Sequence, residues 1–337
     1  MRVKLLIASC DNDYTEHLSA QLSRYHADEI DVSVCKRQEL LNELLAVQKY
    51  DAALIEEPFI SGIDFHSVPL LLLLWTEEEG NPGADCELMR VRKYQRVSTI
   101  VASILENYAK VSKDGHYADS ERGAITAVWS PAGGVGKTTV ALAYAARKAA
   151  EGKQVLYLNL ETFSSAPVYF EETGRSISAV FEMLESNDGD VKTLIRGIRN
   201  KDRSAGITYL CGPDNFDDMN ILSDENISSL IAACAGVTDE LVVDMACVCD
   251  ERSRRVFELA DRVFLVTDHT STAQSKLSQF ATQHNMFTLI KEKTALIANK
   301  GSTALEPQLS AVVHLPLIPS TNVQLVYKSL ANLSFEV

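Results

Sequence analysis

The sequence contains the glycine-rich run Ala127-Val-Trp-Ser-Pro-Ala-Gly-Gly-Val-Gly-Lys-Thr-Thr139. It begins in an apolar run, residues 124–129, that predicts a strand, and it leads into a helix-forming run, residues 140–150. A glycine loop between a strand and a helix, closed by Lys-Thr, is typical of nucleotide phosphate sites. The backbone amides of such a loop and of the helix N-terminus point at the β-phosphate. The stretch therefore predicts a nucleotide-binding α/β domain.

The residue types of the loop have separate predicted roles. Glycine lets the backbone approach the phosphates and adopt φ values that other residues resist. Lys137 is expected to contact the β- and γ-phosphate oxygens, and the hydroxyl of Thr138 is expected to bind Mg²⁺. The predicted cofactor-binding residues of this loop are Gly133, Gly134, Val135, Gly136, Lys137, Thr138 and Thr139.

One residue of the loop departs from the common pattern, G-x-x-x-x-G-K-[ST], which requires glycine where this chain has Pro131. The run Ala132-Gly-Gly-Val-Gly-Lys-Thr138 resembles instead the K-G-G-x-G-K-T loop of MinD/ParA-type ATPases. The resemblance implies ATP and Mg²⁺ as ligands and a homodimer across the nucleotide face. In that family the first lysine of the loop crosses the dimer interface to the partner's nucleotide. Ala132 stands at this place, so the resemblance implies slow hydrolysis here.

Length and charge limit the possible functions. A chain of 337 residues favours two domains. The net charge of the chain is −14. Residues 1–123 carry 13 Lys/Arg against 21 Asp/Glu, a net charge of −8, and the remaining residues carry −6. This balance argues against binding DNA or anionic membranes through overall electrostatics.

The seven cysteines are scattered without a C-x-x-C pair, which indicates a reduced chain rather than a disulfide framework. Cys247-Val-Cys249 is a possible metal fragment, but it has no companion His/Cys cluster in the sequence. No signal peptide is apparent, and the longest apolar stretch, residues 68–75, is too short to span a bilayer. We expect a cytoplasmic protein without a membrane segment, which reaches a cell pole or membrane only through partners.

Short apolar runs alternate with helical patterns through the first 111 residues. The predicted strands are residues 4–9, 31–35, 50–56, 69–75 and 87–91, and the predicted helices are residues 14–25, 38–48 and 97–111. This alternation with short connections predicts a doubly wound parallel sheet.

The order and spacing of these elements resemble a CheY-like response-regulator receiver domain. The functional positions of the receiver fall on Ser9 and Cys10 (the acidic pair), Asp11 (a third acidic position), Glu56 (the phosphoacceptor), Thr76 and Lys93. With the acidic pair missing, the resemblance implies a degenerate receiver that serves for docking. A generic small α/β domain is the alternative. In either case we expect the carboxylates of this surface to be solvated charges.

Polar residues 112–123 lack apolar periodicity and are interpreted as a linker to a second domain, residues 124–337. Beyond the loop, its predicted strands are residues 154–161, 207–211, 240–244, 260–267 and 294–300. Its predicted helices are residues 176–185, 190–199, 223–235, 271–283 and 322–333, and residues 212–218 and 315–319 are predicted loops.

Further site residues follow strands of this domain. Asp244 ends an apolar strand, where a carboxylate beside a phosphate loop can hold Mg²⁺. By resemblance, Glu161 stands where an aspartate helps to orient the attacking water, although a strand end facing solvent is equally consistent. Asn299 stands where an asparagine bonds adenine, and Pro316 lies in the loop that packs near the base. The predicted catalytic residues are Lys137, Glu161 and Asp244, and the predicted metal ligands are Thr138 and Asp244.

A degenerate receiver ahead of a MinD/ParA-type ATPase domain resembles the TadZ/CpaE group. Its members localise machinery for Flp/Tad-type pilus assembly or secretion. One alternative is a ParA-type DNA-partitioning ATPase, which needs a basic surface, and another is a scaffold with a decayed site. The residues that could replace the missing lysine charge are Lys300, Arg252, Arg254 and Arg255.

Overall fold

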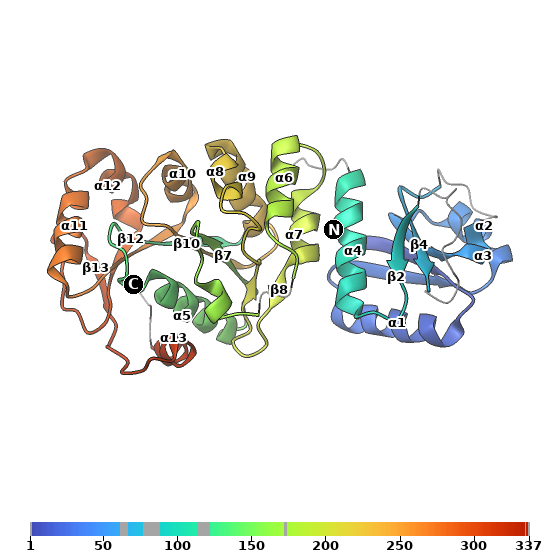
Figure 1. Cartoon of the computed structure of the whole chain (residues 1–337), viewed down its shortest axis with the longest axis horizontal. Coiled ribbons are helices and arrows are strands. Elements are labelled where there is room, and N and C mark those ends of the chain that lie inside the picture. The colour runs from blue at the N-terminus through green and yellow to red at the C-terminus, as the bar shows by residue number, and fades with distance from the viewer. Residues whose placement is uncertain are drawn as a thin grey trace. The chain divides into compact units, whose positions relative to one another are not determined.

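The computed structural model describes residues 2–60, 67–76, 88–112, 122–171, 174–333 and 335. The chain divides into two compact units (Figure 1). The first contains Met1–His116 and Asp188–Gly197, and the second contains Tyr117–Asn187 and Ile198–Val337. Residues 188–197, which the sequence analysis assigned to the second domain, thus belong to the first unit. Of the expected linker, residues 113–121 lie outside the described residues.

The first unit is built on a parallel five-stranded sheet with the order β2-β1-β3-β4-β5. Its strands are β1 (Val3–Ala8), β2 (Ile30–Cys35), β3 (Ala52–Glu56), β4 (Leu70–Trp75) and β5 (Met89–Arg92). This order is that of flavodoxin-like doubly wound sheets, so the predicted parallel sheet is confirmed. The last strand begins two residues later than expected, and Glu87 lies outside the described residues.

Helices cover both faces of this sheet (Figure 1). The helices described in the first unit are α1 (Asn12–Tyr25), α2 (Gln38–Val47), α3 (Glu57–Ile60), α4 (Val97–Val111) and α7 (Val191–Ile198). Because side chains alternate along a strand, Leu5 and Ile7 pack with Leu18 of α1 and Ile104 of α4. Their neighbours Leu6 and Ala8 pack in a separate cluster with residues of α2 and α3.

The second unit is built on an eight-stranded sheet with the order β13-β12-β11-β6-β10-β7-β9-β8. Its strands are β6 (Ala124–Trp129), β7 (Val155–Leu160), β8 (Asn200–Lys201), β9 (Thr208–Tyr209), β10 (Glu240–Met245), β11 (Arg262–Thr267), β12 (Thr294–Ala298) and β13 (Ala311–His314). All pairs are parallel except β8 with β9. The edge strands β8 and β13 were not predicted, and the predicted strand 207–211 is reduced to β9.

The helices of this unit agree with the predictions in most places. They are α5 (Lys137–Ala150), α6 (Ser178–Ser186), α8 (Asp218–Ile221), α9 (Asp224–Ala235), α10 (Glu251–Leu259), α11 (Ser271–Ala281), α12 (His284–Ile290) and α13 (Val323–Ala331), with short 3₁₀ turns η2 (Ala166–Val168) and η3 (Lys291–Lys293). Three of them, α8, α10 and α12, were not predicted. Asp250 caps the N-terminus of α10, since its carboxylate accepts a hydrogen bond from the Ser253 amide at 2.9 Å.

The layers of the second unit determine where its site lies. Helices α5 and α13 cover one face of the sheet, and α9, α10 and α12 lie on the other (Figure 1). The central strand β10 is buried along its whole length. Since the carboxyl ends of parallel strands meet at one edge, the segments that follow β6, β7, β10 and β12 converge there. None of the helices in the described parts has the length and apolarity needed to cross a bilayer.

Candidate functional site

The loop between β6 and α5 has the backbone of a phosphate cradle. Gly134 and Gly136 have φ values of 75° and 93°, and Gly136 caps the N-terminus of α5. The Ser130 hydroxyl accepts a hydrogen bond from the Ala132 amide at 3.1 Å and so fixes the start of the loop. Within the described residues, no acceptor lies against the consecutive backbone amides of residues 133–139. Such a run at a helix N-terminus suits an anion.

Lys137 lies at the floor of this cradle, with only 6% of its surface exposed. Its Nζ donates to Sγ of Cys247 at 3.1 Å and lies 3.4 Å from Oε1 of Glu161. Burial by itself lowers the pKa of Lys137, but the hydrogen bond to Cys247 and the nearby carboxylates outweigh burial and raise it. The ammonium group is therefore charged and held among groups that a phosphate would replace.

Asp244 is completely buried beside Lys137. The Tyr157 hydroxyl donates to its Oδ2 at 2.8 Å, and Asn159 Nδ2 in turn donates to the Tyr157 hydroxyl at 3.0 Å. Burial and the Glu161 charge raise the pKa of Asp244 to about 7, against the lowering effects of its neighbours. Its Oδ1 has no hydrogen-bond partner among the described residues.

The segment after β7 turns Glu161 toward the site. Asn159 Oδ1 accepts a hydrogen bond from the Glu161 amide at 2.8 Å, which fixes the backbone in a tight turn. The Glu161 side chain is 22% exposed and faces Lys137, so it is not simply a strand end in bulk solvent. Asn159 thus supports the backbone before Glu161 without adding a charge.

The donors present fit Mg²⁺, which prefers oxygen ligands and often binds through one or two carboxylates, water and substrate phosphates. The unpartnered Oδ1 of Asp244 is a buried carboxylate oxygen, and the Thr138 hydroxyl lies near enough to lower the pKa of Asp244. Across the described residues, no group of three or more His, Cys, Asp and Glu side chains is arranged around a common point. Thr138 and Asp244 are therefore the residues that would hold the ion together with phosphate oxygens.

Asn299 and Pro316 lie on the other side of the loop. Asn299 Nδ2 donates to the carbonyl of Val135 at 2.9 Å, and a Cβ on Gly136 would lie 2.5 Å from this nitrogen. Because a carbonyl only accepts, the amide nitrogen must face the loop, which leaves Oδ1 of Asn299 as an acceptor. Gly301 donates to the Leu315 carbonyl at 2.8 Å and brings the exposed Pro316 beside this turn.

Position 132 carries no charge, and Ala132 is buried with 4% exposure. Each of the three arginines considered as replacements for the missing lysine charge already pairs with a carboxylate of its own chain. The pairs are Arg252 with Asp250 at 3.2 Å, Arg254 with Glu258 at 3.1 Å, and Arg255 with Glu258 at 2.8 Å and with Asp224 at 3.5 Å. None of them is a free cation directed at the phosphate loop.

Solved structures share this arrangement of strands and helices. The chain is similar to a ParA family ATPase from Chlorobium tepidum, with a TM-score of 0.51 and 19% identity over 63% of this chain and 91% of that chain. The second unit has the fold of ParA-type P-loop ATPases. The predicted P-loop ATPase fold of this unit is thereby confirmed.

Two further structures have lower scores. One is the cell division ATPase MinD of Pyrococcus furiosus, with a TM-score of 0.48 and 13% identity over 62% of this chain and 97% of that chain. The other is a cobyrinic acid a,c-diamide synthase from Mycobacterium smegmatis with bound ADP and magnesium, with a TM-score of 0.47 and 15% identity over 62% and 93%. No protein-family model matches the sequence, and no curated protein matches it.

Three contacts of this site were not predicted from the sequence, although Cys247 and Lys300 were considered there for other roles. Tyr157 holds Asp244, Cys247 accepts from Lys137, and Lys300 contacts the loop itself. Tyr157 precedes Asn159 by two residues and therefore shares its face of β7, so strand alternation was the available signal. Neither the cysteine nor the Lys300 contact had a signal in the spacing of residues.

In the first unit, the receiver-like positions do come together. Glu56 Oε1 accepts from the Ser9 hydroxyl at 2.6 Å and pairs with the Lys93 ammonium, and Oε2 accepts from the Cys10 amide at 2.9 Å. Glu56 and Lys93 are each 6% exposed, so the expectation of a solvated carboxylate at Glu56 is wrong. The lysine made the burial possible by compensating the charge.

The two remaining receiver-like positions lie at the same carboxyl edge or next to it. Asp11 caps α1 by accepting from the Tyr14 amide at 3.1 Å, and it also accepts from the Tyr94 hydroxyl at 2.9 Å. Thr76 directly follows β4. The sheet order agrees with a receiver, and receiver ancestry remains a prediction.

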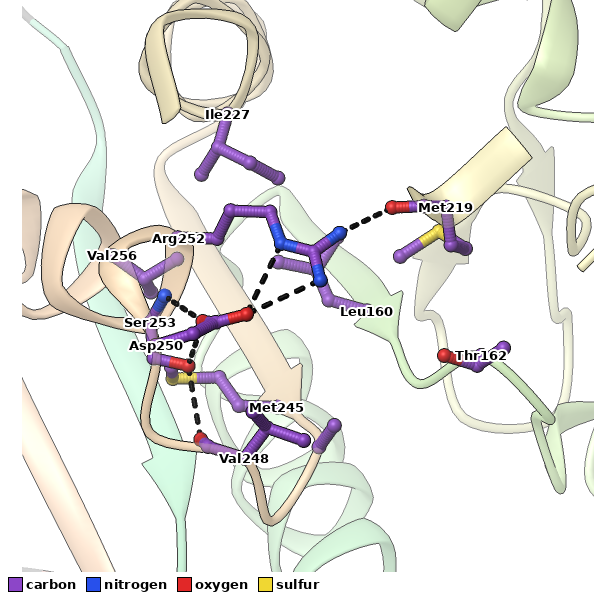
Figure 2. A pocket seen from close by; sticks show the side chains of 11 residues that line it. Leu160, Thr162, Met219, Ile227, Met245, Val248, Asp250, Arg252, Ser253 and Val256 are labelled. Carbon is purple, nitrogen blue, oxygen red and sulfur yellow. Dashed lines mark hydrogen bonds and ion pairs between the residues drawn. The ribbon is translucent and has the colours of Figure 1, made fainter. Parts of the chain in front are cut away.

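A pocket lies where the ends of β7 and β10 meet the start of α10 (Figure 2). Its volume is about 490 Å³, part of it open to solvent, and Leu160 and Met245 are among the residues that line it. Arg252 crosses the wall, where it pairs with Asp250 and donates to the carbonyl of Met219 (Figure 2). Its guanidinium is thereby satisfied, and the rest of the lining is mostly apolar.

Proposed function

We propose that this protein binds ATP with Mg²⁺ and acts as a nucleotide-dependent localisation factor for pilus assembly or secretion machinery. The observation that carries nucleotide binding is the run of backbone amides 133–139 without an internal acceptor, with the Lys137 ammonium beside it. Both features are complementary to a phosphate chain. The ParA-type fold of the second unit supports the same conclusion.

Adenine is the base that the site favours. Since Asn299 donates its amide nitrogen to the Val135 carbonyl, its Oδ1 remains as an acceptor. The 6-amino group of adenine donates a hydrogen bond, whereas guanine carries an acceptor oxygen at the same position. The residues that follow Asn299 and Lys300 are Gly301 and Ser302, which have no carboxylate to accept hydrogen bonds from guanine.

The chain's own groups suggest a binding site with slow hydrolysis. Lys137 neutralises phosphate charge, and Glu161 is placed to orient a water molecule near it. A bound Mg²⁺, held by Thr138 and Asp244, would supply further neutralisation of the phosphates. Ala132 leaves the transition state without the cation that the resembling family provides at this position.

A homodimer across the nucleotide face is part of the proposal. Phe163 and Phe216 are 82% and 48% exposed, and their rings stack with centroids 6.1 Å apart. Phe163 follows Glu161 by two residues, so the aromatic pair borders the phosphate site. Exposed aromatic side chains of this kind are enriched in protein interfaces. We assign the pair to the face that meets the second copy.

The localisation role rests on the combination of a receiver-like unit, whose phosphoacceptor position is occupied by an ion pair, with an ATPase fold. In the first unit, the carboxylate that would accept a phosphoryl group is engaged by Lys93, which suits a docking domain better than a phosphorelay. The net charge of −14 favours protein partners over DNA.

Nucleotide titration of the full chain by calorimetry tests the central proposal. We expect Mg²⁺-dependent ATP binding, weaker GTP binding, and a shift from monomer to dimer in analytical ultracentrifugation with ATP. Phe163→Ser is expected to reduce dimerisation without reducing ATP binding to the monomer, with the exposed Val168→Ser as the matched control. The absence of ATP binding would remove the proposal, and tight DNA binding at physiological salt would favour a partitioning ATPase.

The localisation role has its own test. A fluorescent fusion is expected to form a discrete focus in cells that assemble the machinery, and Lys137→Ala is expected to disperse it. A diffuse wild-type signal in such cells, or a focus that survives the substitution, would contradict nucleotide-dependent localisation.

A further inference from the structure

Two consecutive side chains bind two consecutive carbonyls of the phosphate loop. Asn299 Nδ2 donates to the Val135 carbonyl at 2.9 Å, and Lys300 Nζ donates to the Gly134 carbonyl at 2.6 Å. Both side chains come from the turn that follows β12, far from the loop in sequence. The loop is thus held from outside by an element that its own sequence pattern does not include.

The backbone and the surroundings of Lys300 are specialised for this contact. Its φ is 55°, a left-handed conformation that residues other than glycine rarely adopt, and Gly301 continues it with a φ of 72°. Its Nζ also pairs with Oδ2 of Asp268 at 3.1 Å. Asp268 is itself fixed, since its Oδ1 accepts from the Thr270 amide at 3.0 Å and hydroxyl at 2.6 Å. The ammonium group is therefore anchored between a rigid carboxylate and the loop.

Holding a carbonyl also orients the next amide. The peptide unit is planar and trans, so the carbonyl of one residue and the N–H of the next point in opposite directions. With the carbonyls of Gly134 and Val135 held on the outer side, the amides of Val135 and Gly136 are turned to the inner side. Glycines at 134 and 136 would otherwise leave the loop many conformations to lose on binding.

We propose that Lys300, anchored by Asp268, is a positioning residue that holds the phosphate loop in its anion-binding conformation. This inference rests on the proposed nucleotide binding. It goes beyond that proposal by giving Lys300 a role toward the phosphate loop of its own chain. Lys300 is therefore engaged in its own chain and does not replace the lysine missing at position 132 across an interface.

Binding measurements with two probes, ATP and inorganic tripolyphosphate, test this proposal on the full chain. Lys300→Met is expected to weaken the binding of both probes about tenfold, because a charge-assisted hydrogen bond to the loop is lost. Because tripolyphosphate has no base, weaker binding of this probe shows that the effect does not depend on contacts with adenine. Lys300→Arg should recover much of the affinity, and the exposed Lys291→Met should leave it unchanged.

Asp268→Asn separates positioning from direct charge attraction. It removes the anchor and keeps the lysine charge, so positioning predicts weaker binding by several-fold. A lysine that acted only by attracting phosphate would bind the probes equally well or more tightly once released from the aspartate. In the double variant, the loss is expected to be no larger than in Lys300→Met alone, because both changes disrupt one contact.

The outcomes distinguish this inference from the proposed function. If the wild type binds neither probe, nucleotide binding itself is wrong. If the wild type binds and Lys300→Met or Asp268→Asn binds equally well, only the positioning role is wrong. Thermal unfolding establishes that each variant is folded, and if Lys300→Met does not fold, Asp268→Asn decides.

Discussion

Nζ of Lys137 lies 3.4 Å from Oε1 of Glu161. The lysine is buried and the glutamate is 22% exposed, so the two charges interact in a partly desolvated site. In the proposed function, a nucleotide phosphate replaces the carboxylate as the partner of this ammonium group. The ion pair therefore links the phosphate loop to the end of β7 in a way that nucleotide binding changes.

Lys137→Ala is expected to abolish most of the ATP affinity. Removal of the ammonium leaves phosphate charge uncompensated in a partly desolvated site, at a cost of roughly 2–4 kcal/mol. This cost corresponds to binding weaker by about 30- to 1000-fold, measurable by titration calorimetry. Lys148→Ala, on the same helix and paired with Glu151, is the matched control and should bind like wild type. Unchanged affinity in Lys137→Ala would remove the assignment of the phosphate loop.

Glu161→Gln is expected to move binding and hydrolysis in opposite directions. The variant no longer competes with phosphate for Lys137, so ATP should bind a few-fold more tightly. Hydrolysis should become slower, because Glu161 is the residue proposed to orient water. Equilibrium titration and single-turnover hydrolysis measure the two effects, and Glu151→Gln, at the far end of α5, controls for the change of charge. Parallel losses in both measurements would contradict the role of Glu161.

Asp244 predicts a pH dependence of stability in the absence of nucleotide and magnesium. Burial raises its pKa from 3.8 to about 7, so the unfolded chain releases this proton above about pH 4 while the folded chain keeps it. The free energy of unfolding should therefore fall as pH rises from about 4 to about 7, by about 1.4 kcal/mol for each pH step of one within this interval. Asp244→Asn should remove this part of the slope in urea unfolding with EDTA. Identical slopes for wild type and variant would contradict a buried, protonated Asp244.

The sequence predicted the parts of the site that depend on strand order. Lys137, Thr138, Asp244 and Asn299 meet because parallel strands end at one edge, which periodicity and motif spacing indicate. The contact of Lys300 with Gly134 was not predictable in the same way, since it depends on a positive φ and on Asp268 across the turn. Which side chains pair across neighbouring loops is decided by tertiary packing.

The first domain shows the same limit. The alternation of apolar runs predicted its doubly wound parallel sheet, and the aligned receiver-like positions Ser9, Cys10, Glu56 and Lys93 meet in the structure. The burial of Glu56 was not predicted, because it depends on charge compensation by Lys93 from a different strand end. In the second unit, the short edge strands β8 and β13 were not predicted, since runs of two to four residues carry little periodicity.

Treatment with a small phosphodonor such as acetyl phosphate should leave the first unit unmodified. The carboxylate of Glu56 is engaged by Ser9, the Cys10 amide and Lys93, and the acidic pair that would hold Mg²⁺ is missing. Mass spectrometry of the intact chain should show no adduct of about 80 Da, the mass of one phosphoryl group. A receiver domain with an intact aspartate is the positive control. A stable adduct within residues 1–111 would show that the unit is an active receiver.

Ala132→Lys is expected to accelerate ATP hydrolysis while leaving ATP affinity nearly unchanged. A cation supplied to the transferring phosphate is worth ~10³–10⁵ in rate in related phosphoryl transfers, and wild-type position 132 supplies none. Lys300 and the three nearby arginines pair within their own chain, so they do not fill this role. A lysine at 132 starts from a buried Cβ, but its long side chain can extend to the surface of the loop. Single-turnover hydrolysis with preformed dimers measures the effect, with Ala132→Met as the uncharged control of similar length. A fast wild-type rate that the lysine does not change would show that another cation already completes the site.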